Sequence, residues 1–147
     1  MEEAHEFPVF AQVVLDCTDV RALAEFYRRL LGFEYRPGDE PQEGDGAGAV
    51  DKDWLVLIDS AGARGLAFQQ VEHLPEPTWP EGAVPQQLHL DLTVPSLAEF
   101  EMQNKRALAL GATVLLDRSE DPQEPLRVYA DPAGHPFCIF VHSSSLD

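Results

Sequence analysis

The sequence predicts an α+β fold in which two tandem β-α-β-β-β modules form a curved mixed β-sheet around a concave cleft. Three observations support it: strands and helices follow in the same order in both halves, a glycine ends the helix of each half, and a proline-rich segment separates the halves. We expect a single domain over residues 1–147, because 147 residues fit one hydrophobic core. Its first module spans 10–72, the connection 73–86 and the second module 87–142.

The first module begins with a predicted strand at 10–18, where β-branched and apolar residues dominate. A helix follows, because Asp19 is a good N-cap, apolar residues recur at helical spacing after it, and Gly32 is a natural end. The other expected elements are a short strand at 33–35, a loop rich in Gly, Pro and acidic residues at 37–48, and two strands at 54–59 and 65–71.

Four prolines within residues 73–85 predict a connection that is neither strand nor helix. The second module then repeats the first at an offset of 77 residues, with Gln12 aligned on His89. Ser96 and Glu99 form a capping-box pattern before a helix that should end at Gly111. The strands expected in this module lie at 87–94, 112–117, 126–131 and 136–142, the last two joined by a turn at 131–134.

Composition excludes several classes of partner. Twenty-six acidic and ten basic residues give a net charge of −16, which would repel the phosphate backbone of nucleic acid. No apolar run approaches the roughly 20 residues of a membrane-spanning helix, and the acidic N-terminus does not resemble a secretory signal. We therefore expect a soluble cytoplasmic protein, in which Cys17 and Cys138 stay reduced and buried.

Alternation along the first strand of each module divides its residues between two faces of the sheet. In the second module Leu88, Leu90, Leu92 and Val94 form an apolar face for the helix, which leaves His89, Asp91 and Thr93 on the other face. In the first module Gln12, Val14 and Asp16 share the corresponding face. If the sheet bends strongly, these polar faces line a cleft, where small-molecule sites are usually found.

Two segments of the sequence resemble the vicinal oxygen chelate superfamily, which includes glyoxalase I, bleomycin resistance proteins, fosfomycin-modifying enzymes and extradiol dioxygenases. VVLDCTDVRALAEFYRRLLGFE, residues 13–34, is similar to the family's opening strand and helix. YADPAGHPFCIF, residues 129–140, is similar to its late turn and final strand. The resemblance covers nearly the whole chain and implies the curved sheet and the cleft described above.

The resemblance also implies the positions of a divalent metal site. First-strand ligands would fall on Gln12 and His89, whereas the last-strand carboxylates would fall on Ala67 and Cys138. A ring with one histidine, one amide oxygen and one thiol lacks the strong donors that a divalent ion needs. We therefore expect these to be vestigial positions and the family's metal to be absent.

The leading hypothesis is a glyoxalase-like protein that binds an unidentified small organic molecule without the family's catalytic metal. The rival hypothesis is an enzyme: a lyase, isomerase or dioxygenase that uses Zn, Ni, Mn or Fe on Gln12 and His89, or His89 alone as a base. The residues expected in the cleft are Gln12, Trp54, Gln69, Trp79, His89, Asp91, Cys138 and Phe140.

Three further hypotheses concern the same residues. His89 and Asp91 form an H-x-D pair that could bind iron together with His135 or His142. Cys138 could be a nucleophile with His89 as its base, although an inert buried cysteine is the commoner outcome. Members of the superfamily often dimerise, and exposed strand edges favour a homodimer here.

Overall fold

The structure, a computed structural model, describes residues 6–42 and 52–142. The predicted loop at 37–48 therefore lies partly outside the described residues. The first module has the expected order of elements: β1 (Val13–Cys17), α1 (Val20–Leu31), β2 (Glu34–Tyr35), β3 (Trp54–Ile58) and β4 (Arg64–Gln70).

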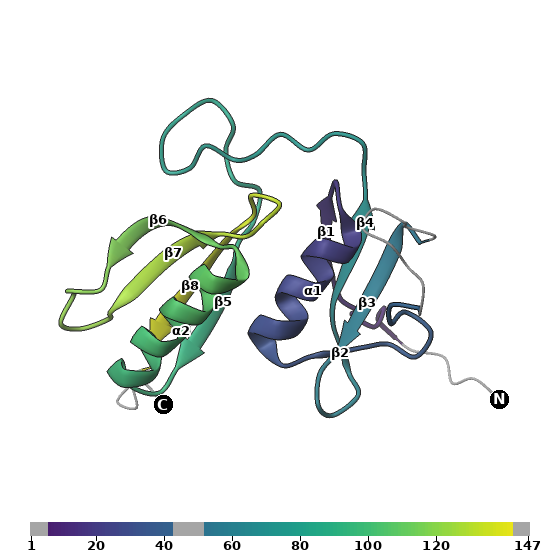
Figure 1. Cartoon of the computed structure of the whole chain (residues 1–147), viewed down its shortest axis with the longest axis horizontal. Helices are drawn as coiled ribbons and strands as arrows, with labels where there is room; N and C mark the ends of the chain where they lie inside the picture. Colours follow the sequence, from purple (N-terminus) through teal and green to yellow (C-terminus); the bar gives the residue numbers. More distant parts are fainter. Residues whose placement is uncertain (1–5, 43–51, 143–147) are drawn as a thin grey trace.

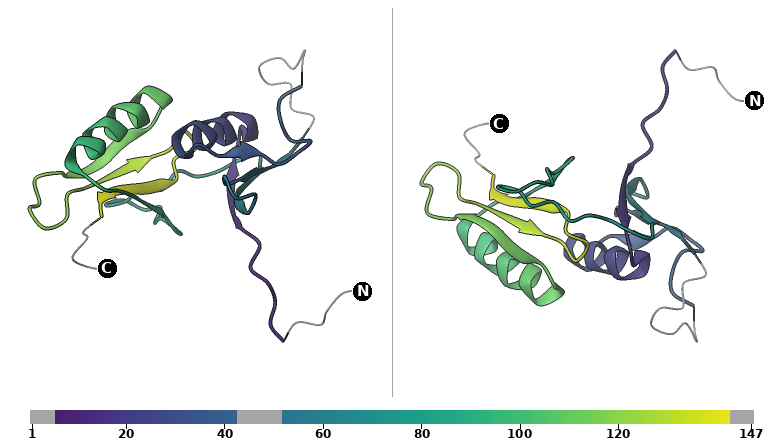
Figure 2. Two further views of the ribbon diagram at one scale, coloured as in Figure 1. Left: turned by 90° about the horizontal axis from the view of Figure 1, so that it is seen from below. Right: turned by 90° about the horizontal axis from the view of Figure 1, so that it is seen from above.

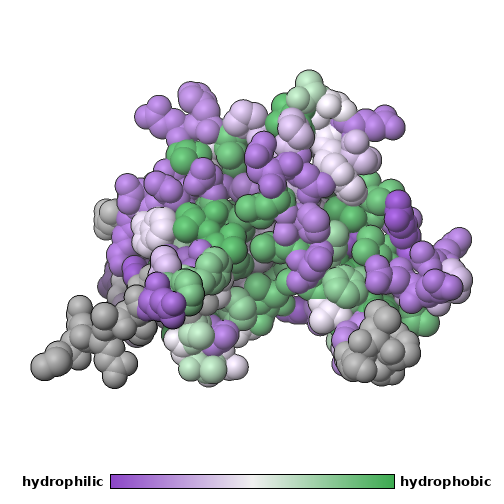
Figure 3. Space-filling model, turned by 180° about the vertical axis from the view of Figure 1, so that it is seen from behind, coloured by the Kyte–Doolittle hydropathy of each residue, from purple (hydrophilic) through white to green (hydrophobic). Residues whose placement is uncertain are grey.

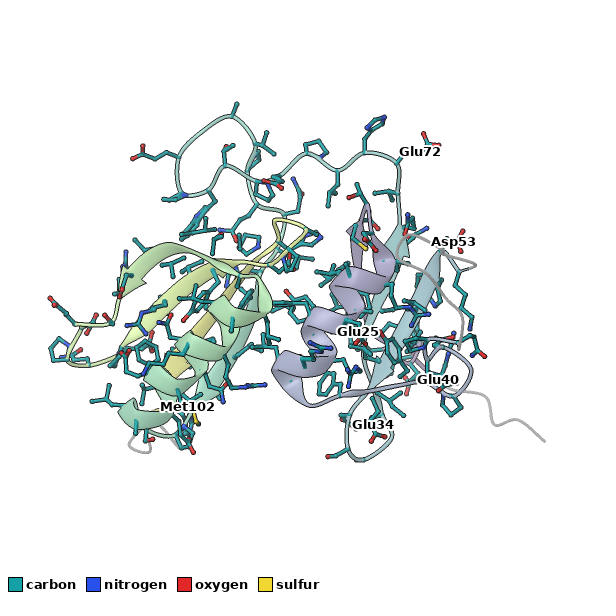
Figure 4. The ribbon with its side chains drawn as sticks, viewed as in Figure 1. Glu25, Glu34, Glu40, Asp53, Glu72 and Met102 are labelled. Atoms are coloured by element: carbon teal, nitrogen blue, oxygen red, sulfur yellow. The ribbon has the colours of Figure 1, made fainter. Side chains whose placement is uncertain are left out.

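The second module repeats this order after the connection, which begins near Glu72 (Figure 4). Its elements are β5 (Leu90–Val94), α2 (Leu97–Leu110), β6 (Thr113–Arg118), β7 (Leu126–Ala130) and β8 (Pro136–Val141). The predicted strand at 87–94 is too long at its start, because β5 begins only at Leu90. Leu88 is 43% exposed and does not join the apolar face of this strand.

Local signals in the sequence set the ends of both helices. The Asp19 carboxylate accepts a hydrogen bond from the Ala22 N–H at 3.1 Å at the start of α1, and the Ser96 hydroxyl accepts one from the Glu99 N–H at 3.2 Å at the start of α2. Gly32 ends α1 with a φ of 71°, a left-handed conformation that glycine adopts without strain.

Each module forms its own four-stranded mixed sheet, with strand orders β1-β4-β3-β2 and β5-β8-β7-β6. In each sheet the first and last strands of the module pair in parallel, and the other pairs are antiparallel. The strands thus form two sheets rather than one continuous sheet, with β1 and β5 at an edge of each. The two modules lie side by side, with α1 near the middle of the molecule in the view of Figure 1.

The two modules meet through buried aromatic side chains of α1 and β8. Phe26 and Tyr27 lie on α1, and their ring centroids are 5.8 and 6.1 Å from that of Phe137 on β8. Arg106 of α2 adds a polar contact, donating a 2.6 Å hydrogen bond to the carbonyl oxygen of Arg29. Both helices lie on one side of the molecule, with the strands on the other side (Figure 2).

The cysteine prediction is confirmed, since Cys17 and Cys138 are both buried and free. Within 6–42 and 52–142, no helix has the length and apolar character needed to span a membrane.

Candidate functional site

The predicted division of the first strand between two faces is visible in β1. Leu15 and Cys17 are 1% exposed and belong to the core, whereas Val14 and Asp16 are exposed on the opposite face. Val14 and Asp16 therefore present an apolar and a carboxylate group away from α1, as the alternation in the sequence predicts.

A cavity of about 370 Å³ lies where this face of β1 meets the proline-rich connection and the start of β8. Its walls are mostly apolar, with Asp16, Gln87 and His135 as the polar groups. The lining residues are Val14, Leu15, Asp16, Leu74, Pro75, Pro77, Val84, Pro85, Gln87, Leu88, His135 and Pro136. Figure 3 shows hydrophobic side chains gathered across the middle of one face of the molecule, with hydrophilic side chains around them.

His135 is held at this cavity by a turn that α1 fixes in place. Its Nε2 lies 2.6 Å from the carbonyl oxygen of Asp16 and acts as the donor, because a carbonyl can only accept. The carboxylate of Asp131 accepts hydrogen bonds from the N–H groups of Ala133 and His135 at 2.8 and 3.0 Å, and from the Tyr27 hydroxyl at 2.6 Å. Burial raises the pKa of Asp131.

The residues predicted on the first sheet form a row that begins at the cavity. Asp16 is the register partner of Gln69, and Gln69 is the partner of Trp54, so the three side chains share one face. Gln12 precedes Val14 by two positions, immediately before β1. Ala67 lies between Val14 and Val56 in the neighbouring row and is fully buried.

The residues predicted on the second sheet come together more closely. Asp91 and Cys138 are register partners on β5 and β8, and His89 Nε2 lies 3.3 Å from an Asp91 oxygen. The nitrogen, oxygen and sulfur atoms that His89, Asp91 and Cys138 can offer a metal all lie within 4.8 Å of one another. Phe140 lies two positions further along β8 and on the same face as Cys138, opposite Thr93.

The environment of Cys138 opposes the hypothesis of a nucleophilic cysteine. Burial, and then the negative charge of Asp91, raise the pKa of its thiol to about 11. A neutral thiol attacks poorly, because the thiolate is the reactive form. In the metal-free protein Cys138 is therefore a weak nucleophile near neutral pH.

None of the eight predicted cleft residues lines the cavity, although several are next to residues that do. His89 follows Leu88, Cys138 follows Pro136 by two positions on the same strand face, and Trp79 lies in the connection between Pro77 and Val84. Sequence reasoning considered His135 only as a possible iron ligand, not as a residue of the cavity, and it missed the apolar walls from the connection. The Asp131–Gly134 turn was the available signal for His135, whereas the contribution of the connection depends on tertiary packing.

The metal ring that the resemblance implies does not fit this structure. Ala67 has no side-chain donor atom, it is fully buried, and its register partners on the neighbouring strands are Val14 and Val56, which also lack donor atoms. Among the described residues, the potential ligands that cluster are His89, Asp91 and Cys138, without His135 or His142.

A family model described as Glyoxalase-like domain matches residues 12–140, most of the chain and both modules. The chain belongs to this family. No match was found among curated proteins. This match confirms the family that the sequence predicts. Solved structures with a similar fold include members of the vicinal oxygen chelate superfamily.

Three of these solved structures illustrate the similarity of fold. A glyoxalase/bleomycin resistance protein/dioxygenase family enzyme from Burkholderia phytofirmans PsJN is 17% identical, with 89% of this chain and 96% of that chain covered and a TM-score of 0.62. The fosfomycin resistance protein FosX from Listeria monocytogenes is 14% identical, with 95% and 97% covered and a TM-score of 0.64. A glyoxalase/dioxygenase from Nostoc punctiforme is 16% identical, with 98% and 100% covered and a TM-score of 0.62.

Proposed function

We propose that this glyoxalase-like domain binds a small organic molecule in the cavity between β1, the connection and the start of β8. The observation that carries the proposal is the cavity itself, whose volume of about 370 Å³ and mostly apolar walls suit a compact ligand. Asp16, Gln87 and His135 supply a few polar groups that would orient it. The predicted cleft residues, including Gln69 and Trp54, would extend this site across the first sheet.

The charge of the chain narrows the class of ligand. Asp16 is the acidic residue in the cavity wall, and the whole chain carries a net charge of −16. Both features disfavour an anion and favour a neutral or cationic molecule with a large apolar surface. FosX of Listeria monocytogenes has a similar fold and is a fosfomycin resistance protein, but the Asp16 carboxylate in the cavity wall here favours a ligand without negative charge.

Ligand-observed and protein-observed NMR with a library of neutral and cationic aromatic fragments tests this proposal. Bound fragments should shift the amide signals of Val14, Leu74 and His135, and Leu88→Arg should abolish their binding by filling the cavity with a charged side chain. Leu97→Arg is the matched control, because Leu97 is 59% exposed on α2 outside the cavity. Fragment binding that survives Leu88→Arg would contradict the proposal.

The rival hypothesis of a metal-dependent lyase, isomerase or dioxygenase on Gln12 and His89 is weaker. A metal site of that kind needs a carboxylate from the last strand of each module, β4 and β8, and the corresponding positions hold Ala67 and Cys138. Among the described residues, the His, Cys, Asp and Glu side chains that lie close enough together to hold an ion are His89, Asp91 and Cys138.

The expected homodimer is supported by an apolar segment that precedes β1. Phe7, Val9 and Phe10 are 70%, 73% and 80% exposed, and the segment extends away from the body of the molecule (Figure 2). Side chains of this size are rarely left in water in such a group. We propose that a second copy of the chain covers them.

Analytical ultracentrifugation tests the homodimer. The chain should sediment with twice the mass of one copy, and the double substitution Phe7→Ser and Phe10→Ser should shift it toward the monomer. Leu97→Ser with Met102→Ser is the control, since both residues are exposed on α2 (Figure 4). A wild-type monomer at micromolar concentration would refute the assembly.

A further inference from the structure

His135 reaches the ligand cavity from a turn between β7 and β8 whose pattern occurs in both modules. Asp131 begins the turn, and its carboxylate accepts hydrogen bonds from the N–H groups of Ala133 and His135 at 2.8 and 3.0 Å. The carbonyl oxygen of Asp131 accepts a third hydrogen bond, from the Gly134 N–H at 2.9 Å. Gly134 has a φ of 97°, which favours glycine. The turn thus uses the backbone of His135 but not its side chain.

The equivalent turn of the first module, between β3 and β4, has an alanine in place of this histidine. The Asp59 carboxylate accepts hydrogen bonds from the N–H groups of Ala61 and Ala63 at 2.9 and 3.0 Å. The carbonyl oxygen of Asp59 accepts one from the Gly62 N–H at 3.0 Å, and Gly62 has a φ of 85°. Ala63 therefore occupies the position of His135 in the same hydrogen-bond pattern. Since the turn does not need a histidine, the imidazole of His135 requires another explanation.

One nitrogen of the His135 ring is committed to the protein backbone. Nε2 lies 2.6 Å from the carbonyl oxygen of Asp16, in the other module, and it carries the proton because a carbonyl oxygen only accepts. In the neutral imidazole the other nitrogen, Nδ1, is then an unprotonated acceptor. The contact with Asp16 therefore sets the tautomer of the ring as well as its position.

Nδ1 of His135 has no hydrogen-bond partner within residues 6–42 and 52–142. In this part of the chain, the buried side-chain nitrogen and oxygen atoms without a partner are Gln86 Oε1 and Arg127 Nη1. Nδ1 is not one of them, so it is accessible. Because His135 lines the cavity, this acceptor is available to a bound molecule.

The other polar side chains of the cavity wall have the same preference. An ionised carboxylate such as that of Asp16 only accepts hydrogen bonds, whereas the amide of Gln87 both donates and accepts. The remaining lining residues have apolar side chains. Acceptors therefore outnumber donors among the side chains of the cavity, and a ligand that supplies donors matches them best.

We propose that Nδ1 of His135 accepts a hydrogen bond from an N–H or O–H group of the ligand, so that the cavity selects apolar molecules that carry such a donor. This inference rests on the proposed cavity ligand and adds the feature that distinguishes ligands of equal size. A molecule with the same apolar surface but no donor displaces water from Nδ1 and leaves that nitrogen unpaired. Such a molecule should bind more weakly for that reason.

Two pairs of isomers test this selectivity on the full chain, with affinities measured by protein-observed NMR titration. The molecules 3-methylindole and 1-methylindole have the same atoms, but only the first has an N–H; p-cresol and anisole differ in the same way by an O–H. The wild type should bind the donor of each pair about fivefold more tightly than its isomer. His135→Gln retains an N–H near the position of Nε2 but no acceptor at that of Nδ1, and should bind both isomers equally.

Two further variants and one spectrum complete the test. His135→Asn places an amide oxygen at the position of Nδ1 and should retain the preference. His142→Gln, at an exposed histidine after the end of β8, should behave as the wild type. In the imidazole nitrogen NMR spectrum of the wild type, recorded well above the ordinary pKa of histidine, 3-methylindole should shift the Nδ1 signal of His135 and 1-methylindole should not. This spectrum needs no variant, so it remains informative if His135→Gln does not fold.

The outcomes separate this inference from the proposed function. Equal affinities of the isomers for the wild type, or a preference that is unchanged in His135→Gln, would overturn the selectivity while leaving the cavity as a ligand site. Loss of the preference in both His135→Asn and His135→Gln would assign it to the whole ring and would also overturn the role of Nδ1. If no member of either pair binds at millimolar concentration, the proposed function fails and this inference fails with it.

Discussion

At the scale of single residues, the least expected arrangement surrounds Asp39, a buried carboxylate in the turn after β2. Its side chain is 4% exposed, accepts a hydrogen bond from the Val56 N–H at 3.0 Å, and lies 2.7 and 3.0 Å from the cationic groups of Lys52 and Arg36. Burial alone would raise its pKa, but the hydrogen bonds and charges of these partners lower it below the usual range.

Asp39→Asn should therefore destabilise the protein in a pH-dependent manner. A carboxylate with a lowered pKa in the folded state stabilises the fold above its unfolded pKa, and this contribution is lost as the pH falls through the folded pKa. Urea unfolding should show a loss of about 1–3 kcal/mol at pH 7 that shrinks below about pH 4. Asp53→Asn, at an exposed position, removes the same charge without a buried ion pair and serves as the control. A loss that is constant with pH would contradict this assignment.

The sequence could predict which candidate-site residues lie close together only where both residues belong to the same strand. His89 and Asp91 share a face by alternation, and the structure places them together with Cys138. Alternation cannot predict that His135 contacts the backbone of Asp16, because that contact depends on how the two modules pack. The cavity was missed for the same reason, since its walls come from segments far apart in the sequence.

At the scale of elements, α1 depends on its N-cap. Asp19 accepts a hydrogen bond from the Ala22 N–H, and the helix then buries Val20, Leu23, Phe26, Tyr27 and Leu30. Asp19→Ala should lower the free energy of unfolding by about 1 kcal/mol. Asp19→Ser keeps an acceptor at the cap and should remain near the wild type. Equal losses in the two variants, measured by urea unfolding, would show that the cap is not the cause.

Helices were easier to predict than strand limits. The caps and end glycines of α1 and α2 are local signals, and the structure confirms both ends of each helix. The start of β5 depends instead on pairing with β8, whose first register partner is Phe137 opposite Leu90. Residues 87–89 have a strand-like sequence but lack that pairing, and Gln87 and Leu88 line the cavity instead.

At the scale of the whole molecule, Phe137 joins the two modules. It is fully buried, and its ring packs on Phe26 and Tyr27 of α1 as well as on Tyr129 of β7. The module order could be predicted from the sequence because the pattern repeats. The separation into two sheets could not, because it depends on which strands of the two modules pair, and β1 and β5 each end a sheet without pairing across the modules.

Phe137→Ala should therefore destabilise both modules together. The lost aromatic packing and the resulting cavity should cost about 3–5 kcal/mol. In a Trp79→Phe background, the fluorescence of Trp54 reports on β3 of the first module and should show the loss during urea unfolding, even though the Phe137 substitution lies in the second module. Leu97→Ala, at an exposed position of α2, should be nearly neutral. An unchanged Trp54 transition would indicate that the modules unfold independently.

The proline-rich connection has a consequence for the thermodynamics of ligand binding. Pro75, Pro77 and Pro85 line the cavity, and each has a backbone torsion already fixed by its ring before the chain folds. The wall of the cavity that these prolines form therefore loses little conformational entropy when a ligand binds. A ligand should bind with a negative heat-capacity change from apolar burial and without the large unfavourable entropy that accompanies the ordering of a flexible lid.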